Sequence, residues 1–149
     1  MRPYKFPLEA VLKLRKMKEE KALDVYTASV NKCVEKRKQL VSAERRHNEL
    51  TQMVVKGRSS SFSASMQGAY NAALDLAQKS IHDAEKAVEK SESEKAGNLK
   101  QFLDLKRSAE VLVNLRSTQK SAFEQEQQRK EEIEMEDLIM SRRAHASGI

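Results

Sequence analysis

The side chains that most often carry chemistry in proteins are few in this chain and far apart. Its three histidines, His47, His82 and His145, have no second His, Cys or Glu four residues away, the spacing that places two metal ligands on one helix face. The chain also lacks a zinc-finger spacing and a glycine-rich phosphate loop. We find no nucleophile, base and orienting group as a set, so the sequence predicts a protein that is not an enzyme and needs no metal or cofactor.

Cys33 is the single cysteine of the chain. One cysteine cannot form an intramolecular disulfide, which fits a reducing compartment. No stretch of 18 apolar residues occurs, and the first residues lack the apolar core of a signal peptide. We therefore expect a cytoplasmic protein.

Basic residues concentrate in the first part of the chain. Residues 1–58 contain 15 Lys and Arg against 7 Asp and Glu, whereas residues 59–149 contain 13 against 15. Such a basic half would suit nucleic acid, an anionic membrane surface or an acidic protein. Glutamates interrupt the basic clusters at residues 36–38 and 45–46, which is more typical of a solvated coiled-coil surface than of a DNA-reading helix. No nucleic-acid partner is expected.

The composition points to long helices. Charged residues make up 34% of the chain and aromatic residues 5%, and there are only 4 Gly and 2 Pro among 149 residues. Turns need Gly, Pro, Asn and Asp, so this chain has material for only one or two reversals. We predict an all-α protein, with residues 1–149 forming a single coiled-coil rod.

One convincing loop divides the chain. Lys56–Ser65 contains Gly57 and five serines, which compete with helical hydrogen bonding. The sequence predicts a first helix over about 7–55, starting at Pro7, and a loop over about 56–65 with Ser63 or Ser65 capping the next helix. The second helix is predicted over about 66–143, with a kink possible at Gly97 and a frayed tail over 144–149.

Apolar residues recur every three and four positions in both helices, which indicates a left-handed supercoil. If the chain folds back near residue 60, partner numbers add to about 121, and similar residues meet without adjustment. The predicted pairs are Leu40 with Ile81, Cys33 with Val88, His47 with Leu74, and Leu12 with Ala109. This favours an antiparallel two-helix coiled-coil hairpin, monomeric and with a longer second helix, although a parallel dimer would use the same seam.

The unequal helix lengths leave one end without a partner. Folding at the loop pairs Met1 with about Lys120, so residues 121–143 extend past the first helix as a single helix. That segment still carries apolar side chains, which suggests an external partner.

Both ends of the chain carry a family resemblance. Phe6, Leu8, Leu12, Leu14 and Arg15, followed by Glu19, Glu20 and Ala22, resemble the N-terminal signature of the FliJ family of flagellar export stalks. Glu136-Asp137 followed by Arg142 is similar to the closing pattern of that family, and the serine-rich reversal and longer second helix also match. Stalk proteins of type III injectisomes look similar at both ends and are the nearest alternative, followed by a generic structural or nucleic-acid-associated coiled coil.

The resemblance implies a non-enzymatic stalk that inserts into the export ATPase hexamer and stimulates it. It also implies binding to the cytoplasmic domain of the membrane export gate and to export chaperones, at the inner membrane. The charged residues expected to contact the ATPase ring are Arg15, Lys16, Lys18, Arg129, Glu136, Asp137, Arg142 and Arg143. The residues expected to contact the gate, near the loop, are Gln39, Ala43, Leu50, Tyr70, Leu74 and Ile81.

Overall fold

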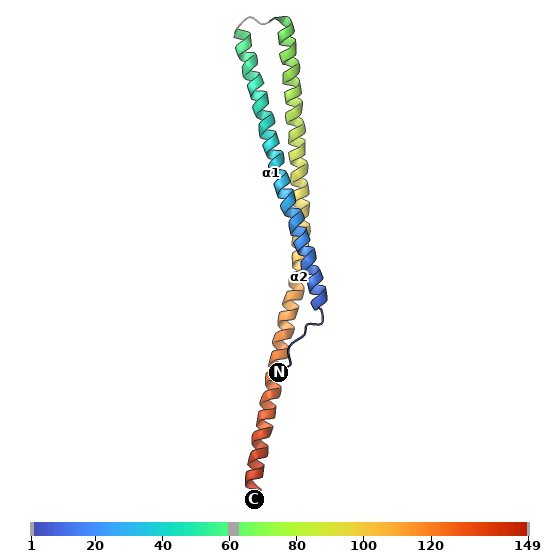
Figure 1. The fold of residues 1–149 in the computed structure, drawn as a ribbon, viewed down its shortest axis with the longest axis vertical. Helices are drawn as coiled ribbons and strands as arrows, with labels where there is room; N and C mark the ends of the chain where they lie inside the picture. Colours follow the sequence, from blue (N-terminus) through green and yellow to red (C-terminus); the bar gives the residue numbers. More distant parts are fainter. Residues whose placement is uncertain (1, 60–62, 149) are drawn as a thin grey trace. The chain divides into compact units, whose positions relative to one another are not determined.

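A computed structural model describes residues 2–59 and 63–148. Its two helices are α1, Glu9–Ser59, and α2, Ala64–Ser147 (Figure 1). No strand occurs in the described ranges. The predicted all-α class and the two-helix coiled-coil hairpin with a longer second helix are therefore confirmed.

The chain divides into two compact units, and each helix contributes to both. The first unit consists of Met1–Glu19 and Asp104–Ile149, and the second of Glu20–Leu103. In the second unit, α1 and α2 run in opposite directions on either side of the reversal (Figure 1). The prediction of one domain over residues 1–149 stays a prediction.

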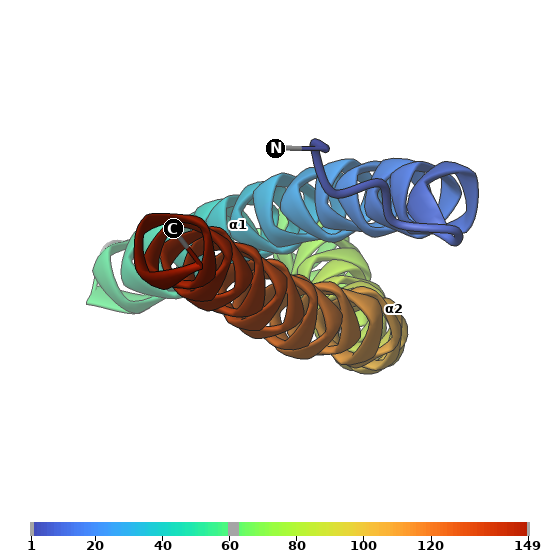
Figure 2. The ribbon, with the colours of Figure 1, turned by 90° about the horizontal axis from the view of Figure 1, so that it is seen from below.

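The start of α1 is set by a turn that contains Pro7 and Leu8. The amide of Glu9 donates to the carbonyl of Phe6 at 3.2 Å, and the amide of Leu12 donates to Leu8 at 2.9 Å. Residues 2–6 before this turn are not helical, and Figure 2 shows them as an extended trace. The helix therefore begins two residues later than predicted, with Glu9 in its first turn, where negative charge is favourable.

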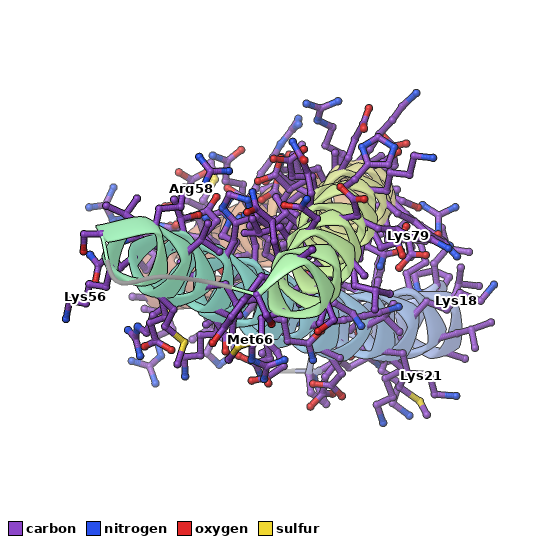
Figure 3. All side chains as sticks on the ribbon, turned by 90° about the horizontal axis from the view of Figure 1, so that it is seen from above. Lys18, Lys21, Lys56, Arg58, Met66 and Lys79 are labelled. Carbon is purple, nitrogen blue, oxygen red and sulfur yellow. The ribbon has the colours of Figure 1, made fainter. Side chains whose placement is uncertain are left out.

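The helical region is longer than predicted at the reversal, because α1 continues through Gly57 to Ser59. Lys56 and Arg58 occupy its last turn, where positive charge stabilises the exposed carbonyls (Figure 3). At the other side, the amide of Met66 donates to Oγ of Ser63 at 3.3 Å, so Ser63 rather than Ser65 caps α2. The remaining loop prediction, over residues 60–62, lies outside the described residues.

The end of α2 also differs from the prediction. The helix continues to Ser147, whose hydroxyl donates to the carbonyl of Arg143 at 2.8 Å. Residues 144–147 are therefore helical rather than a frayed tail, since neither Pro nor an early Gly interrupts them. Gly97 lies inside the same uninterrupted helix.

The two helices pair slightly out of the predicted register. Arg15 meets Ser108, Glu9 meets Arg116 and Lys32 meets Glu94, each two to five residues further along α2 than predicted. Leu12 likewise packs in one cluster with Leu112. The shift follows from the helix ends, because a reversal between Ser59 and Ala64 has its centre after residue 60.

The apolar packing is thin, as expected for two helices. In the first unit, Phe6, Leu12 and Leu112 form a buried cluster, and Leu12 is only 1% exposed. In the second unit the buried residues are small. They are Ser29, Cys33, Ala43, Val54 and Ser91. Leu23, which belongs to the apolar repeat of the first helix, is 42% exposed.

Candidate interaction surfaces

The side chains that could hold a metal ion lie far apart in the described residues. No group of three or more His, Cys, Asp and Glu side chains in residues 2–59 and 63–148 is placed to hold a metal ion. The thiol of Cys33 is buried in the seam, as predicted, and is 2% exposed. No helix among the described residues is long and apolar enough to cross a membrane. What the structure offers instead is exposed helix surface, and this surface lies in both units.

The N-terminal part of the predicted ring contact belongs to the first unit. Arg15 is half-buried, and its Nη1 donates to the carbonyl of Ser108 at 2.9 Å. The guanidinium of Arg15 therefore ties α1 to α2, which reduces its availability to a partner. Lys16 and Lys18 are exposed, and their spacing of two residues points them to different sides of α1.

The C-terminal part of the predicted ring contact is fully exposed. Arg129, Glu136, Asp137, Arg142 and Arg143 all lie on α2, and every side chain over residues 128–148 is exposed. Apolar side chains share this segment. They are Ile133, Met135, Leu138, Ile139 and Met140, with exposures of 47%, 61%, 55%, 48% and 69%. A helix that exposes this many apolar groups gains free energy when a partner covers them.

The single-helix segment starts later than residue 121, because the N-terminal segment covers the preceding turns. The ring of Tyr4 lies 5.5 Å from the ring of Phe123 at an interplanar angle of 48°. The hydroxyl of Tyr4 donates to Oε1 of Gln119 at 3.1 Å. Arg2 and Tyr4 also line a groove together with Gln127. The segment without a partner in the first unit is thus residues 128–148, which we call the C-terminal segment.

An ion pair that the sequence analysis missed fixes the start of α1. Nη1 of Arg116 lies 3.4 Å from Oε1 of Glu9, and both side chains are partly buried. The signal was present, since Arg116 follows the buried Leu112 by four residues and so lies on the side of α2 that faces α1, where an arginine needs an acidic partner. Only the position of Glu9 in the first helical turn would have identified that partner.

The predicted gate contact falls in the second unit. Gln39 and Ala43 line one shallow groove of about 340 Å³ that crosses both helices. The other lining residues are Ser42 and Arg46 from α1, and Ser80, Asp83, Ala84 and Ala87 from α2. Small side chains form its floor, so the groove exists because Ala43, which is 6% exposed, faces alanines rather than leucines. The structure therefore brings two of the six predicted gate residues together.

The other four predicted gate residues do not line this groove. Leu50, Tyr70, Leu74 and Ile81 are half-buried. Their partial burial in a two-helix unit leaves part of each side chain accessible. The sequence analysis missed Ala84 and Ala87. The signal that could have identified them is the presence of two small residues, three positions apart, on the helix that pairs with Ala43.

Ion pairs join the two helices along the second unit. Nζ of Lys32 lies 3.2 Å from Oε2 of Glu94, and the guanidinium of Arg37 pairs with Glu92. The hydrogen bond to Glu92 and the negative charge of its carboxylate raise the pKa of Arg37 above its ordinary value. Arg37 is fully charged at any physiological pH with or without this shift, so the pair serves to orient α1 against α2.

A comparison with protein families agrees with the resemblance at the chain ends. The model of a family described as "Flagellar FliJ protein" matches residues 4–148, nearly the whole chain. Neither a curated protein nor a solved structure matches the chain.

Proposed function

The chain belongs to the FliJ family of flagellar proteins, and we propose that it is the stalk of the export ATPase. As a member of this family it is a component of the flagellar export apparatus, and the family is non-catalytic. The match favours flagellar export over the injectisome alternative. In the proposed role the protein inserts into the ATPase hexamer, stimulates ATP hydrolysis, and links the ring to the export gate and to export chaperones. It would act in the cytoplasm, at the periphery of the inner membrane.

The observation that carries the proposal is the exposed C-terminal segment. Its charged residues and those of the α1 start belong to one unit, in which Tyr4 packs the N-terminal segment against Phe123 of α2. A helix bearing both exposed apolar groups and charges on both sides is suited to a narrow, charged pore. The proposed ring contacts are Lys16, Lys18, Arg129, Glu136, Asp137, Arg142 and Arg143, with Arg15 positioning α1 through Ser108.

The groove over Ala43, Ala84 and Ala87 supports the second half of the proposal, a contact with the gate. Its small-residue floor admits an apolar side chain or an extended segment, and Arg46 and Asp83 at its edges provide polar contacts. Leu50, Tyr70, Leu74 and Ile81 would extend this contact toward the reversal.

Steady-state ATP hydrolysis by the cognate export ATPase tests the ring contact. We expect saturable stimulation near one chain per hexamer. Truncation after Gln127 should abolish stimulation while leaving the Tyr4–Phe123 contact in place. The double variant Arg142→Glu/Arg143→Glu should raise the concentration needed for half-maximal stimulation at least tenfold.

The matched control reverses two exposed lysines of the second unit, Lys21 and Lys79, which changes the net charge equally (Figure 3). This control should stimulate as the wild type does. Full stimulation by the truncated chain would overturn the proposed ring contact. A gate-binding assay with Gln39→Trp, a change at an exposed residue that lines the groove, then tests the groove separately, since it leaves the C-terminal segment unchanged.

A further inference from the structure

The C-terminal segment carries a stripe of side chains with apolar residues at its centre. Side chains through which one helix pairs with another recur at alternating intervals of three and four residues. Through Met135 and Leu138, this spacing selects a single row along the segment. The row consists of Gln128, Glu131, Met135, Leu138, Arg142 and His145. All six side chains are exposed, so the whole row is open to a partner.

The two charged residues of the stripe have opposite signs and lie on either side of its apolar centre. Glu131 lies one turn before Met135, and Arg142 lies one turn after Leu138. None of the ion pairs among residues 2–59 and 63–148 involves either of these two charges. They are separated by about 16 Å along the helix, at 1.5 Å per residue, so they cannot bond to each other. Only another molecule can pair them both.

A second copy of the chain in antiparallel orientation supplies that pairing. The intervals along the row are three, four, three, four and three residues, and this order is the same in either direction. A two-fold axis halfway between residues 136 and 137 therefore brings all six positions into register. It places Met135 opposite Leu138 of the second copy and Glu131 opposite its Arg142. In a parallel pair, each charge would instead meet its own copy, which is unfavourable.

The residues at the edges of the stripe are compatible with the same pairing. Glu132 lies near Ile139 of the second copy, and Glu134 lies near its Ser141, so no two like charges meet at either edge. Ile139 is 48% exposed and adds apolar area beside Leu138. The antiparallel pairing is therefore favoured by charge at every position of the stripe and opposed at none of its edges.

The stripe is also free along its whole length. The groove that α2 forms with the N-terminal segment is lined on α2 by residues as far as Gln127. The row begins at the next residue, Gln128, and α2 continues beyond its last member, His145, to Ser147. A second helix thus finds exposed surface over the 18 residues that the pairing requires.

We propose that two copies of the chain pair through this stripe as an antiparallel, two-fold symmetric dimer. The same patch is used by both copies, so the contact is closed and association stops at two chains. Every contact occurs twice, which doubles the effect of any substitution in the stripe. Two layers of Met135 and Leu138 bury less than the roughly 1,200 Å² of a standard interface, so the dimer is weak and reversible.

The pairing does not rest on the stalk function, but one consequence of it does. Arg142 is also a proposed contact of the ATPase ring. A chain paired through this stripe cannot present Arg142 to the ring, so dimer formation and insertion into the hexamer would exclude each other. The dimer would then be a storage form that separates when the ring is available.

Sedimentation equilibrium of the full chain, from micromolar to about 1 mM, tests the proposal without the ATPase. We expect the mean mass of the wild type to rise with concentration and to approach that of two chains. Glu131→Arg and Arg142→Glu should each weaken dimerisation at least tenfold, because each places two pairs of like charges in contact. Both residues are exposed, so helical content by circular dichroism should not change.

The decisive sample is the double variant Glu131→Arg/Arg142→Glu. It exchanges the two charges within one chain and has the net charge of the wild type. In the antiparallel dimer each charge again meets its opposite, so dimerisation should return to within about threefold of the wild type. An equimolar mixture of the two single variants should recover as well, since the altered positions then meet with opposite charges and the other contact is native.

The matched controls change the net charge by the same amounts on the other side of the helix. Glu136→Arg and Arg129→Glu alter exposed residues of the same segment that lie outside the stripe. Both should dimerise as the wild type does. Equal weakening by these controls would assign the effect to net charge and overturn the inference.

Three further results would also overturn it. The first is a wild type that remains monomeric up to about 1 mM, which would leave the stripe for a different partner. The second is a mass that rises beyond two chains, because a closed contact cannot do this. The third is a double variant that dimerises no better than either single variant, which would exclude the antiparallel pairing of Glu131 with Arg142.

Discussion

The two units of the chain use the same pair of helices but pack them with different side chains. The first unit buries large residues, Phe6, Leu12 and Leu112, with Tyr4 packed against them. The second unit buries only small ones, chiefly Ser29, Cys33 and Ser91. Its serine hydroxyls donate to carbonyls of their own helices, Tyr26 at 2.6 Å and Val88 at 2.8 Å. No buried side-chain polar atom of the described residues lacks a partner.

The difference teaches where the stability of a two-helix protein comes from. A large apolar side chain contributes about 1.5 to 3 kcal/mol when buried, whereas a buried serine bonded to its own helix contributes little across the seam. We therefore expect the first unit to hold its structure more strongly than the second. The second unit has small buried residues along its seam, which leaves its surface grooves shallow.

The largest effect is expected at Leu12. Leu12→Ala removes the most buried leucine of the cluster and should lower the free energy of unfolding by about 2 to 4 kcal/mol. Backbone hydrogen exchange should accelerate in the first unit. The control, Leu14→Ala, truncates a leucine that is 52% exposed and should change stability by less than about 0.5 kcal/mol. Equal effects at both positions would contradict the comparison.

A smaller effect is expected where Tyr4 holds the N-terminal segment. Phe123→Ala removes the ring that Tyr4 packs against and should cost about 1 kcal/mol. Exchange of the amide of Glu9, which donates to the carbonyl of Phe6, should increase, and that of residues 20–59 should not. Leu138→Ala is the matched control on the exposed C-terminal segment. Protection of the Glu9 amide that survives Phe123→Ala would show that Phe6 alone anchors the segment.

Gly97 allows the second unit to be strengthened without altering its seam. A Cβ at this position meets no heavy atom within 4 Å. Gly97→Ala should therefore raise stability by about 0.8 to 1 kcal/mol, through helix propensity alone. The measurement is the thermal midpoint by circular dichroism, with exchange slowed around residue 97. A lowered midpoint would mean that α2 needs flexibility there.

The smallest effect is expected from the ion pair between Lys32 and Glu94. A double-mutant cycle with Lys32→Ala and Glu94→Ala should give a coupling of about 0.2 to 1 kcal/mol, because both side chains are about half exposed. The coupling should decrease between 0.05 and 0.5 M salt, roughly, since screening weakens exposed pairs. A coupling that salt leaves unchanged would indicate packing of the lysine stem rather than charge.

Much of the fold follows from sequence periodicity, because the apolar spacing of both helices and the scarcity of turn residues admit few other structures. The burial of Cys33 and Ala109 follows from the same pattern. The helix ends do not follow from this pattern, because the composition of the serine-rich stretch favours a loop. In the structure, Lys56 and Arg58 lie in the last turn of α1, and Ser63 caps α2, so both helices extend into that stretch. A small error in the reversal then moves every cross-helix pair.

The surfaces were harder to predict than the fold. Charged residues of the C-terminal segment are exposed as the length difference requires, but Arg15 is engaged with Ser108. Phe6 was noted only as part of the family resemblance, yet its side chain is part of the buried cluster. Contacts of an extended segment have no periodicity, so sequence spacing cannot reveal them. The groove over Ala43 likewise depends on register, which the sequence fixes only within a few residues.

The position of Cys33 has a practical consequence. A single thiol that is 2% exposed reacts with an alkylating reagent only when the helices around it separate. At high reagent concentration, its labelling rate equals the rate at which the second unit opens. The opening rate of the second unit can therefore be measured by mass spectrometry on the native chain, without any substitution. Labelling of Cys33 should become slower when a partner holds the two helices together.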